Sequence, residues 1–295
     1  INLIRENGIH ILFDMSGHTK KNRLPIFVNK PAPLQVTWIG YNASTGLKEI
    51  DYIIGDQYVT PLENKNQFTE NILQLPNIWS CLSKPAFEIK KENSSPALQN
   101  GFITFGSFNN LSKINDNVID IWSEILKRVK DSKLFLKAKQ LDNLEMVESI
   151  RKKFQKNGIS TEKIITEGRS KTREEMLKKY NQIDIALDPF PYSGVTTSFE
   201  SVWMGVPLLT IKGNNFYSRI GVSINKNLGM DDWIANNEKD YSTKILKLTS
   251  DFNQLSQTRK CLINKVDSST LFDSSLFADN FNKILWKIWE KFTTK

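Results

Sequence analysis

Cysteine and long apolar runs are both scarce in this chain of 295 residues. Its two cysteines, Cys81 and Cys261, form neither a CxxC pair nor a cluster with histidine, so the sequence predicts neither a disulfide framework nor a zinc site. No apolar run approaches the roughly 20 residues that cross a bilayer, and no charged-then-apolar leader opens the chain. We therefore expect a protein of the reducing cytoplasm, without a membrane partner.

Several motifs that identify common enzyme classes are also missing. The sequence has no GxGxxG after a strand, no GxxxxGK[ST], no HExxH and no GxSxG. These absences argue against a nicotinamide enzyme, a P-loop enzyme, a zinc peptidase and an α/β-hydrolase. An Asp-x-Asp pair that would hold a divalent cation on a diphosphate is absent from the loops after strands. We expect no metal and no cofactor.

Positive charge is in modest excess. Lysine and arginine number 40 against 32 for aspartate and glutamate, which gives a net charge of +8. Such an excess suits a phosphate-bearing partner, nucleic acid included. The basic residues are nevertheless spread along predicted helices and interleaved with acidic ones, as on solvated helix faces. We therefore do not expect a nucleic-acid partner.

Short apolar runs alternate with amphipathic stretches, a pattern typical of a parallel sheet covered by helices. The predicted strands are 8–15, 34–40, 52–55, 71–75, 102–107, 133–137, 163–166, 183–187 and 207–211. From residue 102 onward they alternate regularly with helices near 115–130, 141–157, 172–181 and 196–205, which predicts a doubly wound α/β domain.

Residues 84–100 are polar, contain proline and show little periodicity, so they predict a domain boundary. We divide the chain into residues 1–90, a looser α/β unit; residues 100–271, a Rossmann-like domain; and residues 272–295, an amphipathic helix. The first residues read as the end of a helix that runs straight into a strand. We therefore expect the chain to begin inside a domain.

A proline-rich loop and a helix start follow the predicted strand 183–187. Gly194 allows a ligand to approach the backbone, and Thr196 and Thr197 place hydroxyl groups beside the free N–H groups of the first helical turn. A diphosphate would fit there because these N–H groups and the helix dipole attract anions, and Glu200 would accept hydrogen bonds from ribose hydroxyls. The alternative, a threonine-capped helix that binds nothing, stays open on these residues.

A second turn, residues 105–113, follows the predicted strand 102–107 and is rich in aromatic and amide side chains. Ligands of open parallel sheets bind beyond the carboxyl ends of the strands, so Lys113 would face the same crevice and neutralise a phosphate. A solvent-exposed lysine at a helix start is the alternative interpretation.

Two polar turns that contain glycine follow strands in the first part of the chain. One spans residues 14–19 and includes His18, and the other spans residues 38–46 and includes Gly40 and Tyr41. Such turns commonly carry binding residues. His18 would act either as a general base or as a hydrogen-bonded loop residue, and both interpretations stay open.

Three blocks of sequence stand in order at residues 14–57, 105–136 and 187–223. They contain SGHTKKNR and QVTWIGYNASTG, then FGSFNNLSK, then LDPFPYSGVTTSFE. Together they resemble the catalytic region of the O-GlcNAc transferase and SPINDLY family of glycosyltransferases, and the resemblance covers nearly the whole chain.

The resemblance implies a GT-B architecture of two Rossmann-like domains, of which the first would be truncated here. It implies metal-independent, inverting transfer of GlcNAc from UDP-GlcNAc, or of fucose from GDP-fucose in the SPINDLY branch, to Ser and Thr hydroxyls of intracellular proteins. The first part of the chain would then lie on the acceptor side and the second would hold the nucleotide-sugar. The fragment alone is expected to be inactive.

The resemblance also implies roles for individual residues. By position, Asn110 matches an amide that contacts the donor, and Lys113 matches a lysine that stabilises the leaving diphosphate. Thr196 and Thr197 match phosphate-binding threonines at the helix start, and Glu200 matches an acidic residue on the ribose.

Further positions are less closely matched. Gly40 matches a position in the turn near the sugar. The family also has a basic residue on the loop before the strand at 183, and either Lys171 or Arg173 would correspond to it. Val195 and Met176 replace two histidines of the animal enzymes, of which the first lies beside the uracil. The base, and with it the donor, is therefore left open.

Two further departures concern the sugar pocket and the start of the chain. Asn42 replaces the usual proline of a GYP turn. The tetratricopeptide repeats of the family, together with a histidine-bearing start of its first catalytic domain, would lie before Ile1, and the general base is expected there.

The sequence thus predicts an inverting glycosyltransferase that acts on protein hydroxyls. One alternative is an enzyme with a glycan or lipid acceptor. Another, of a different class, is a binding or scaffold protein that keeps the fold without turnover.

Overall fold

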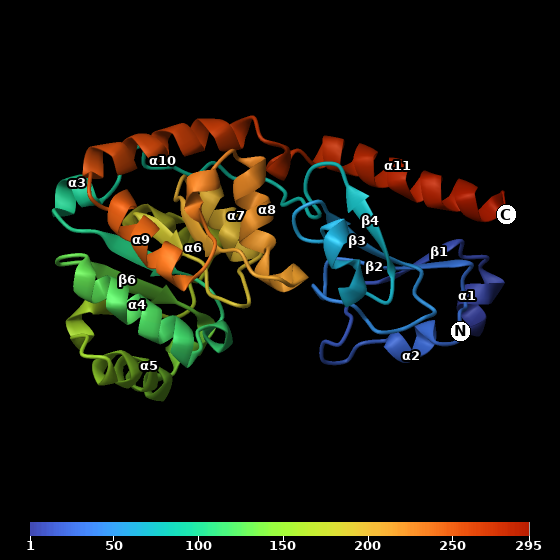
Figure 1. Ribbon diagram of the computed structural model, residues 1–295, viewed down its shortest axis with the longest axis horizontal. Coiled ribbons are helices and arrows are strands. Elements are labelled where there is room, and N and C mark those ends of the chain that lie inside the picture. The colour runs from blue at the N-terminus through green and yellow to red at the C-terminus, as the bar shows by residue number, and fades with distance from the viewer. Residues whose placement is uncertain (295) are drawn as a thin grey trace. The chain divides into compact units, whose positions relative to one another are not determined.

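The computed structural model describes residues 1–294 and divides into two compact units (Figure 1). Unit 1 comprises residues 1–83, 214–219 and the chain from 270 onward, and unit 2 comprises 84–213 and 220–269. The boundary at residues 83–84 lies at the start of the expected linker. The closing helix and residues 214–219 belong to unit 1, a grouping that the linear division into 1–90, 100–271 and 272–295 does not contain.

Unit 1 is built on a four-stranded parallel sheet in the order β1-β2-β3-β4. Its strands are β1 (Ile11–Asp14), β2 (Leu34–Thr37), β3 (Tyr52–Asp56) and β4 (Asn71–Leu75). The predicted strands 8–15 and 34–40 are too long, because Gly8 and Ile39 adopt φ angles of +60° and +64°, outside the β region. Turns therefore occupy some of the residues that the apolar pattern assigns to these two strands.

The long helix α11 (Ser274–Thr293) packs on this sheet (Figure 1). Val36, Ile54 and Ile288 are buried together in the shared core. The short helix α2 (Leu24–Phe27) joins a second apolar cluster. Strands with apolar residues on both faces are expected of a parallel sheet, since both faces are covered. Unit 1 begins with α1 (Asn2–Glu6), and no helix among residues 1–294 is long and apolar enough to span a membrane.

Residues 214–219 leave the body of unit 2 in the sequence and pack within unit 1. Phe216 meets the buried Trp79 edge to face, with ring centroids 5.3 Å apart. The Arg219 guanidinium donates to the Tyr58 carbonyl, and the Asn214 carbonyl accepts from the side-chain amides of Asn64 and Gln67. A loop between two elements of unit 2 is thus part of unit 1.

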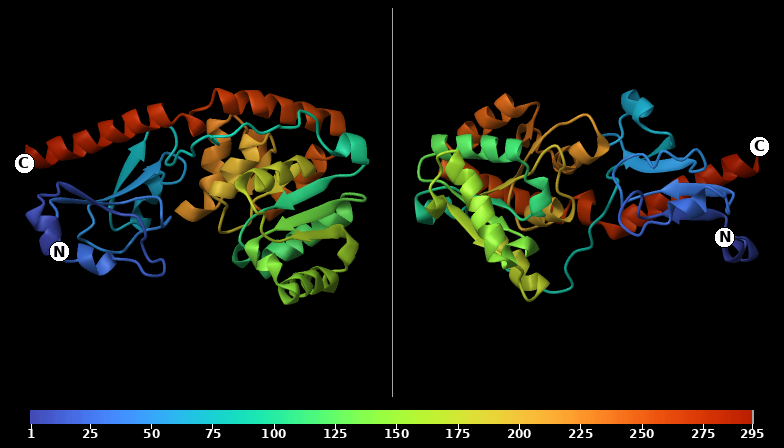
Figure 2. Two further views of the ribbon diagram at one scale, coloured as in Figure 1. Left: turned by 180° about the vertical axis from the view of Figure 1, so that it is seen from behind. Right: turned by 90° about the horizontal axis from the view of Figure 1, so that it is seen from below.

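Unit 2 contains a doubly wound parallel sheet in the order β10-β9-β8-β5-β6-β7. Both views of Figure 2 show helices around the strands of this unit. Its strands are β5 (Thr104–Ser107), β6 (Lys133–Lys137), β7 (Ile164–Glu167), β8 (Ile185–Leu187), β9 (Leu208–Ile211) and β10 (Ile234–Ala235). All but the two-residue β10 lie at predicted strands. The chain leaves β5 toward β6 and later returns to its other side as β8, so the direction of winding reverses between β5 and β8. Ligands bind at such switch points.

Eight helices accompany this sheet in the described part of unit 2. They are α3 (Ala97–Asn100), α4 (Asp116–Arg128), α5 (Leu144–Lys156), α6 (Arg173–Lys178), α7 (Thr196–Trp203), α8 (Ile220–Asn227), α9 (Glu238–Leu248) and α10 (Phe252–Asp267). Helix α4 contacts α5 and α9, whereas α7 contacts α8 and α10, which gives the sheet a helical layer on each side (Figure 1). The sequence marks several starts by capping residues, such as Asn115, whose side chain accepts from the Val118 N–H at 2.9 Å.

Short 3-10 helices fill the connections. They are η1 (Leu62–Gln67), η2 (Leu111–Lys113), η3 (Lys139–Asp142), η4 (Thr161–Lys163), η5 (Lys179–Gln182), η6 (Phe216–Ser218), η7 (Asp231–Trp233) and η8 (Thr270–Phe272).

Candidate functional site

The turns after β5 and β8 lie side by side because these two strands are neighbours in the sheet. Thr197 Oγ1 donates to Asn109 Oδ1 at 2.9 Å, and Lys113 Nζ donates to the Ser193 carbonyl at 2.7 Å. The Asn115 side chain also joins the turns, through a hydrogen bond to the carbonyl of the β8 loop at Phe190. Two segments about 80 residues apart in sequence are thus joined at the switch point.

Gly194 closes the β8 loop against the start of α7. A Cβ atom on this residue would lie 2.4 Å from Ser198 Oγ, 2.7 Å from Thr197 Oγ1 and 2.9 Å from Asn109 Oδ1. No side chain fits at these distances, so only glycine allows the loop to approach the helix start this closely. Three side-chain oxygen atoms therefore lie close to the backbone at Gly194.

The start of α7 carries N–H groups that no side chain caps. Its N-cap is Val195, which has no hydrogen-bonding side chain, and the N–H groups of Thr196 and Thr197 receive no acceptor from residues 1–294. The threonine-capped helix considered as an alternative is therefore not formed. Free N–H groups and the positive end of the helix dipole together favour an anion.

Lys113 lies at the end of η2 beside this helix start. It is half-buried, and its Nζ lies 4.4 Å from the centroid of the Tyr192 ring. Burial lowers the pKa of Lys113, while the carboxylate of Asp188 opposes that shift. The side chain is therefore not the solvent-exposed lysine of the alternative interpretation.

The two amides after β5 have different surroundings. Asn110 is exposed, caps η2 by accepting from the Ser112 N–H at 3.0 Å, and accepts from the Gln140 amide. The buried Asn109 is the one that contacts Thr197. Sequence reasoning missed Asn109, and the only available signal was its position two residues past the strand.

Glu200 is buried one turn into α7, with 5% of its surface exposed. Burial raises its pKa to about 7, although the Arg173 guanidinium, 3.6 Å away, opposes the rise. Of the two basic candidates, Arg173 thus reaches the site. Lys171 is exposed, and its backbone N–H donates to Glu175. The hydroxyl of the buried Tyr180, also missed from the sequence, donates to the Thr197 carbonyl at 3.0 Å.

The raised pKa of Glu200 predicts a pH-dependent stability. Between its ordinary value of 4.5 and about 7, the unfolded chain is ionised at this position while the folded protein is protonated. Stability should therefore fall as pH rises through this range, by about 3 kcal/mol, and level off above it. In Glu200→Gln the decrease should be smaller by this amount, and what is left includes the contribution of Asp188, whose pKa is also raised by burial. Urea unfolding at pH 5 and 8 measures it, with the exposed Glu148→Gln as the control. Equal pH dependence in all three proteins would contradict the prediction.

The candidates of unit 1 lie together in two turns. A Cβ on Gly40 would come 1.7 Å from the Met15 carbonyl oxygen, so this position requires glycine. His18 Nε2 is 2.8 Å from the Thr45 carbonyl, and its ring meets that of Tyr41 edge to face at 5.4 Å. His18 thus has the contacts of a hydrogen-bonded loop residue, while its role as a base stays a prediction.

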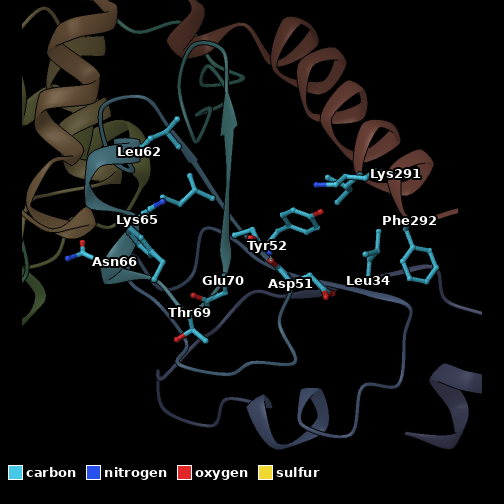
Figure 3. Close-up of a pocket in the computed structure, with 14 residues that line it drawn as sticks. Leu34, Asp51, Tyr52, Leu62, Lys65, Asn66, Thr69, Glu70, Lys291 and Phe292 are labelled. Atoms are coloured by element: carbon cyan, nitrogen blue, oxygen red, sulfur yellow. Dashed lines mark hydrogen bonds between the residues drawn. The ribbon is translucent and has the colours of Figure 1, made fainter. Parts of the chain in front are cut away.

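A separate cavity of about 860 Å³ lies in unit 1, between the end of α11 and the beginnings of β2, β3 and β4 (Figure 3). Two of its acidic residues already have partners: Asp51 pairs with Lys30, and Glu70 accepts from Thr45. None of the predicted site residues lines this cavity. The switch point of unit 2 therefore remains the candidate site.

The fold and the site define a class of enzyme. Two Rossmann-like units, of which one carries an uncapped helix start beside a half-buried lysine, constitute a GT-B fold. The chain belongs to glycosyl transferase family 41, whose sequence pattern it matches over residues 1–82 and 89–281. The resemblance drawn from the three sequence blocks is thereby confirmed.

Individual relatives agree with this assignment. The chain is 36% identical over 294 residues to the probable UDP-N-acetylglucosamine--peptide N-acetylglucosaminyltransferase SPINDLY of Solanum lycopersicum, and 27% identical over 299 residues to the SEC protein of Arabidopsis thaliana, which bears the same enzyme name. These alignments cover 98% and 97% of this chain but 31% and 30% of the two relatives. The chain therefore spans about a third of their length.

Solved structures show the same fold. A point mutant of the Thermobaculum terrenum O-GlcNAc transferase matches with a TM-score of 0.92 at 30% identity, over 99% of this chain and 55% of that one. Anabaena HepE, solved with UDP, matches with a TM-score of 0.58 at 11% identity, over 100% of this chain and 81% of that one. The latter similarity supports the fold alone.

Proposed function

We propose that this chain holds the nucleotide-sugar of a glycosyltransferase that moves GlcNAc from UDP-GlcNAc to Ser and Thr hydroxyls of proteins. The observation that supports the proposal most strongly is the uncapped start of α7 beside Lys113. Gly194, which has no side chain, lies in the loop that leads into this helix start. The names of the SPINDLY and SEC relatives supply the donor and the acceptor class.

In the proposed reaction the acceptor hydroxyl gives its proton to a general base and its oxygen attacks the anomeric carbon. The bond from that carbon to the diphosphate oxygen breaks at the same time, with inversion. Negative charge then grows on the departing diphosphate. The free N–H groups of Thr196 and Thr197 and the ammonium of Lys113 are fixed before the reaction, so they stabilise this charge without reorganisation. We propose that these groups do the work that a cation does in metal-dependent enzymes.

Glu200 and Arg173 would complete the donor site. A carboxylate at Glu200 accepts hydrogen bonds from ribose hydroxyls, and Arg173, 3.6 Å away, favours its ionised form. Burial opposes ionisation, so ribose binding by Glu200 should strengthen as pH rises through about 7.

GDP-fucose is the second candidate donor. The chain is closer in sequence to SPINDLY, at 36% identity, than to SEC, at 27%, and GDP-fucose is the donor that the SPINDLY resemblance implied. Val195, the N-cap of α7, also brings no imidazole to the place where the animal enzymes contact uracil.

Calorimetric titration decides between these donors. We expect saturable binding of UDP and UDP-GlcNAc, unchanged by EDTA, and weaker binding of GDP and GDP-fucose. The reverse order would favour the second candidate. Loss of binding in EDTA would contradict metal independence, and no binding of any nucleotide to a chain that circular dichroism shows to be folded would contradict the donor site.

A further inference from the structure

Asp188 is a fully buried carboxylate directly after β8. Its Oδ1 accepts from the Gly194 N–H at 2.7 Å, and its Oδ2 accepts from the Thr210 hydroxyl at 2.7 Å. Gly221 packs against the same carboxylate so closely that a Cβ there would lie 2.5 Å from Oδ2. The carboxylate is thus held on several sides by β9, α8 and its own loop.

The hydrogen bond to Gly194 closes the loop that begins at Asp188. Ser193, immediately before Gly194, presents the carbonyl oxygen that receives Lys113 Nζ at 2.7 Å. The Ser193 carbonyl and the Gly194 N–H belong to the same planar peptide unit, so the hydrogen bond from Gly194 to Asp188 also affects the position of that carbonyl. Asp188 therefore determines both where the loop backbone lies and where Lys113 points.

The carboxylate also acts on Lys113 through its charge. Burial lowers the pKa of Lys113, and the negative charge of Asp188 opposes this shift. The pKa of Asp188 is raised to about 6 by burial, which leaves it ionised at neutral and alkaline pH. The other titratable group that faces it is Tyr241 of α9, whose pKa is raised by burial and by Asp188, so it stays neutral there.

We propose that Asp188 is a positioning residue of the donor site. It shapes the loop from Asp188 to Gly194, here called the phosphate loop, through the Gly194 N–H, and it keeps Lys113 charged for the departing diphosphate. Only the role toward the departing diphosphate rests on the proposed function. The shape of the loop and the charge of Lys113 belong to the ligand-free protein and can be tested without any nucleotide.

A purely structural buried aspartate exists in the same domain and provides a control. Asp184, at the other end of the β8 segment, accepts from the N–H groups of Ala97 at 2.9 Å and Thr104 at 2.8 Å, and from the Ser95 hydroxyl. These bonds anchor α3 and β5. The hydrogen bonds of Asp184 go to Ser95, Ala97 and Thr104, which lie outside the loop from Asp188 to Gly194.

The test variant is Asp188→Asn. An asparagine amide can accept from the Gly194 N–H and donate to Thr210 Oγ1, so it keeps the shape of the site and removes the charge. Carbon NMR of lysine-labelled, ligand-free protein follows the titration of Lys113, whose signal is assigned with Lys113→Arg. We expect the midpoint of Lys113 to move to lower pH in Asp188→Asn and to stay in place in Asp184→Asn. An unmoved midpoint in Asp188→Asn would overturn the proposal.

A measurement on the unaltered protein covers the case in which Asp188→Asn does not fold. The amide signal of Gly194 should titrate with a midpoint near 6, because its N–H donates to Asp188. Thr210→Val, which removes one donor to the carboxylate, should move that midpoint to higher pH. A Gly194 signal that does not respond between pH 5 and 7 would overturn the role of Asp188 in the loop.

Nucleotide affinity tests the link to function. Near pH 7 the binding of UDP to Asp188→Asn should be close to that of the unaltered protein, and at alkaline pH it should be roughly tenfold weaker, the cost of losing a charged hydrogen-bond donor to phosphate. Asp184→Asn should show no such pH dependence. If the unaltered protein binds neither UDP nor GDP, the proposed function fails, whereas the titration of Lys113 still decides whether Asp188 controls its charge.

Discussion

Lys113→Ala is expected to lower the rate of sugar transfer by about 100- to 1,000-fold, the usual effect of removing one preorganised group from a developing negative charge. The donor KM should change less, since the additional negative charge of the leaving diphosphate develops only as the bond to the sugar breaks. Steady-state transfer to an acceptor peptide, by the whole protein that contains this chain, measures both constants. Hydrolysis of the donor in the absence of acceptor provides a second readout.

The structure supplies a matched control for this variant. Lys139 begins η3 after the neighbouring strand β6, on the same edge of the sheet, and is exposed. Lys139→Ala should keep full activity. If folded Lys113→Ala also kept full activity, the proposed role of Lys113 in catalysis would be wrong. The alternative of a binding or scaffold protein would then be favoured.

Gly194→Ala is expected to weaken nucleotide binding by about 100-fold. The added methyl group would stand within 3 Å of Ser198 Oγ, Thr197 Oγ1 and Asn109 Oδ1, so these side chains, the loop or the first turn of α7 must move. A shift of about 1 Å in a positioning element is sufficient for a loss of this size. Calorimetry with UDP measures it, and circular dichroism shows whether the domain is still folded.

Gly101→Ala is the control for Gly194→Ala. Gly101 also lies in unit 2, at the end of α3, where φ is +74° and no atom lies near the added Cβ. The left-handed conformation makes alanine unfavourable there by about 1 kcal/mol, so stability should fall while nucleotide affinity does not. If Gly194→Ala bound UDP as tightly as Gly101→Ala, the close packing of the loop would have no part in binding.

Much of the fold follows from patterns that the sequence carries locally. Strands β4 and β6 begin and end at the predicted residues. For β6, which is buried along most of its length, this is expected because a buried parallel strand has a short apolar run between polar turns. The amphipathic helix predicted for residues 272–295 is observed as α11, Ser274–Thr293. The two-residue β10 escaped prediction, since two residues show no period.

The candidate site was predicted in part. Lys113, Gly194, Thr196, Thr197, Glu200 and Arg173 come together at the switch point. Their roles in catalysis and binding stay predictions. Asn110 and Lys171 are exposed, and their contacts are with Ser112, Gln140 and Glu175. The choice between Asn109 and Asn110 depends on which amide the turn after β5 buries, and neighbouring amides look alike in a sequence.

By itself, the sequence determined the strand and helix pattern, the GT-B class and the family, because periodicity and short motifs are properties of neighbouring residues. Only the tertiary structure decided that residues 214–219 and α11 belong with unit 1 and that α7 starts without a cap. It also decided that Asp188 holds the loop whose Ser193 carbonyl receives Lys113. These facts depend on contacts between segments far apart in the chain. The charge and hydrogen bonding of a buried group such as Asp188 depend on the residues that pack against it in the folded protein, and a local sequence pattern does not identify those residues.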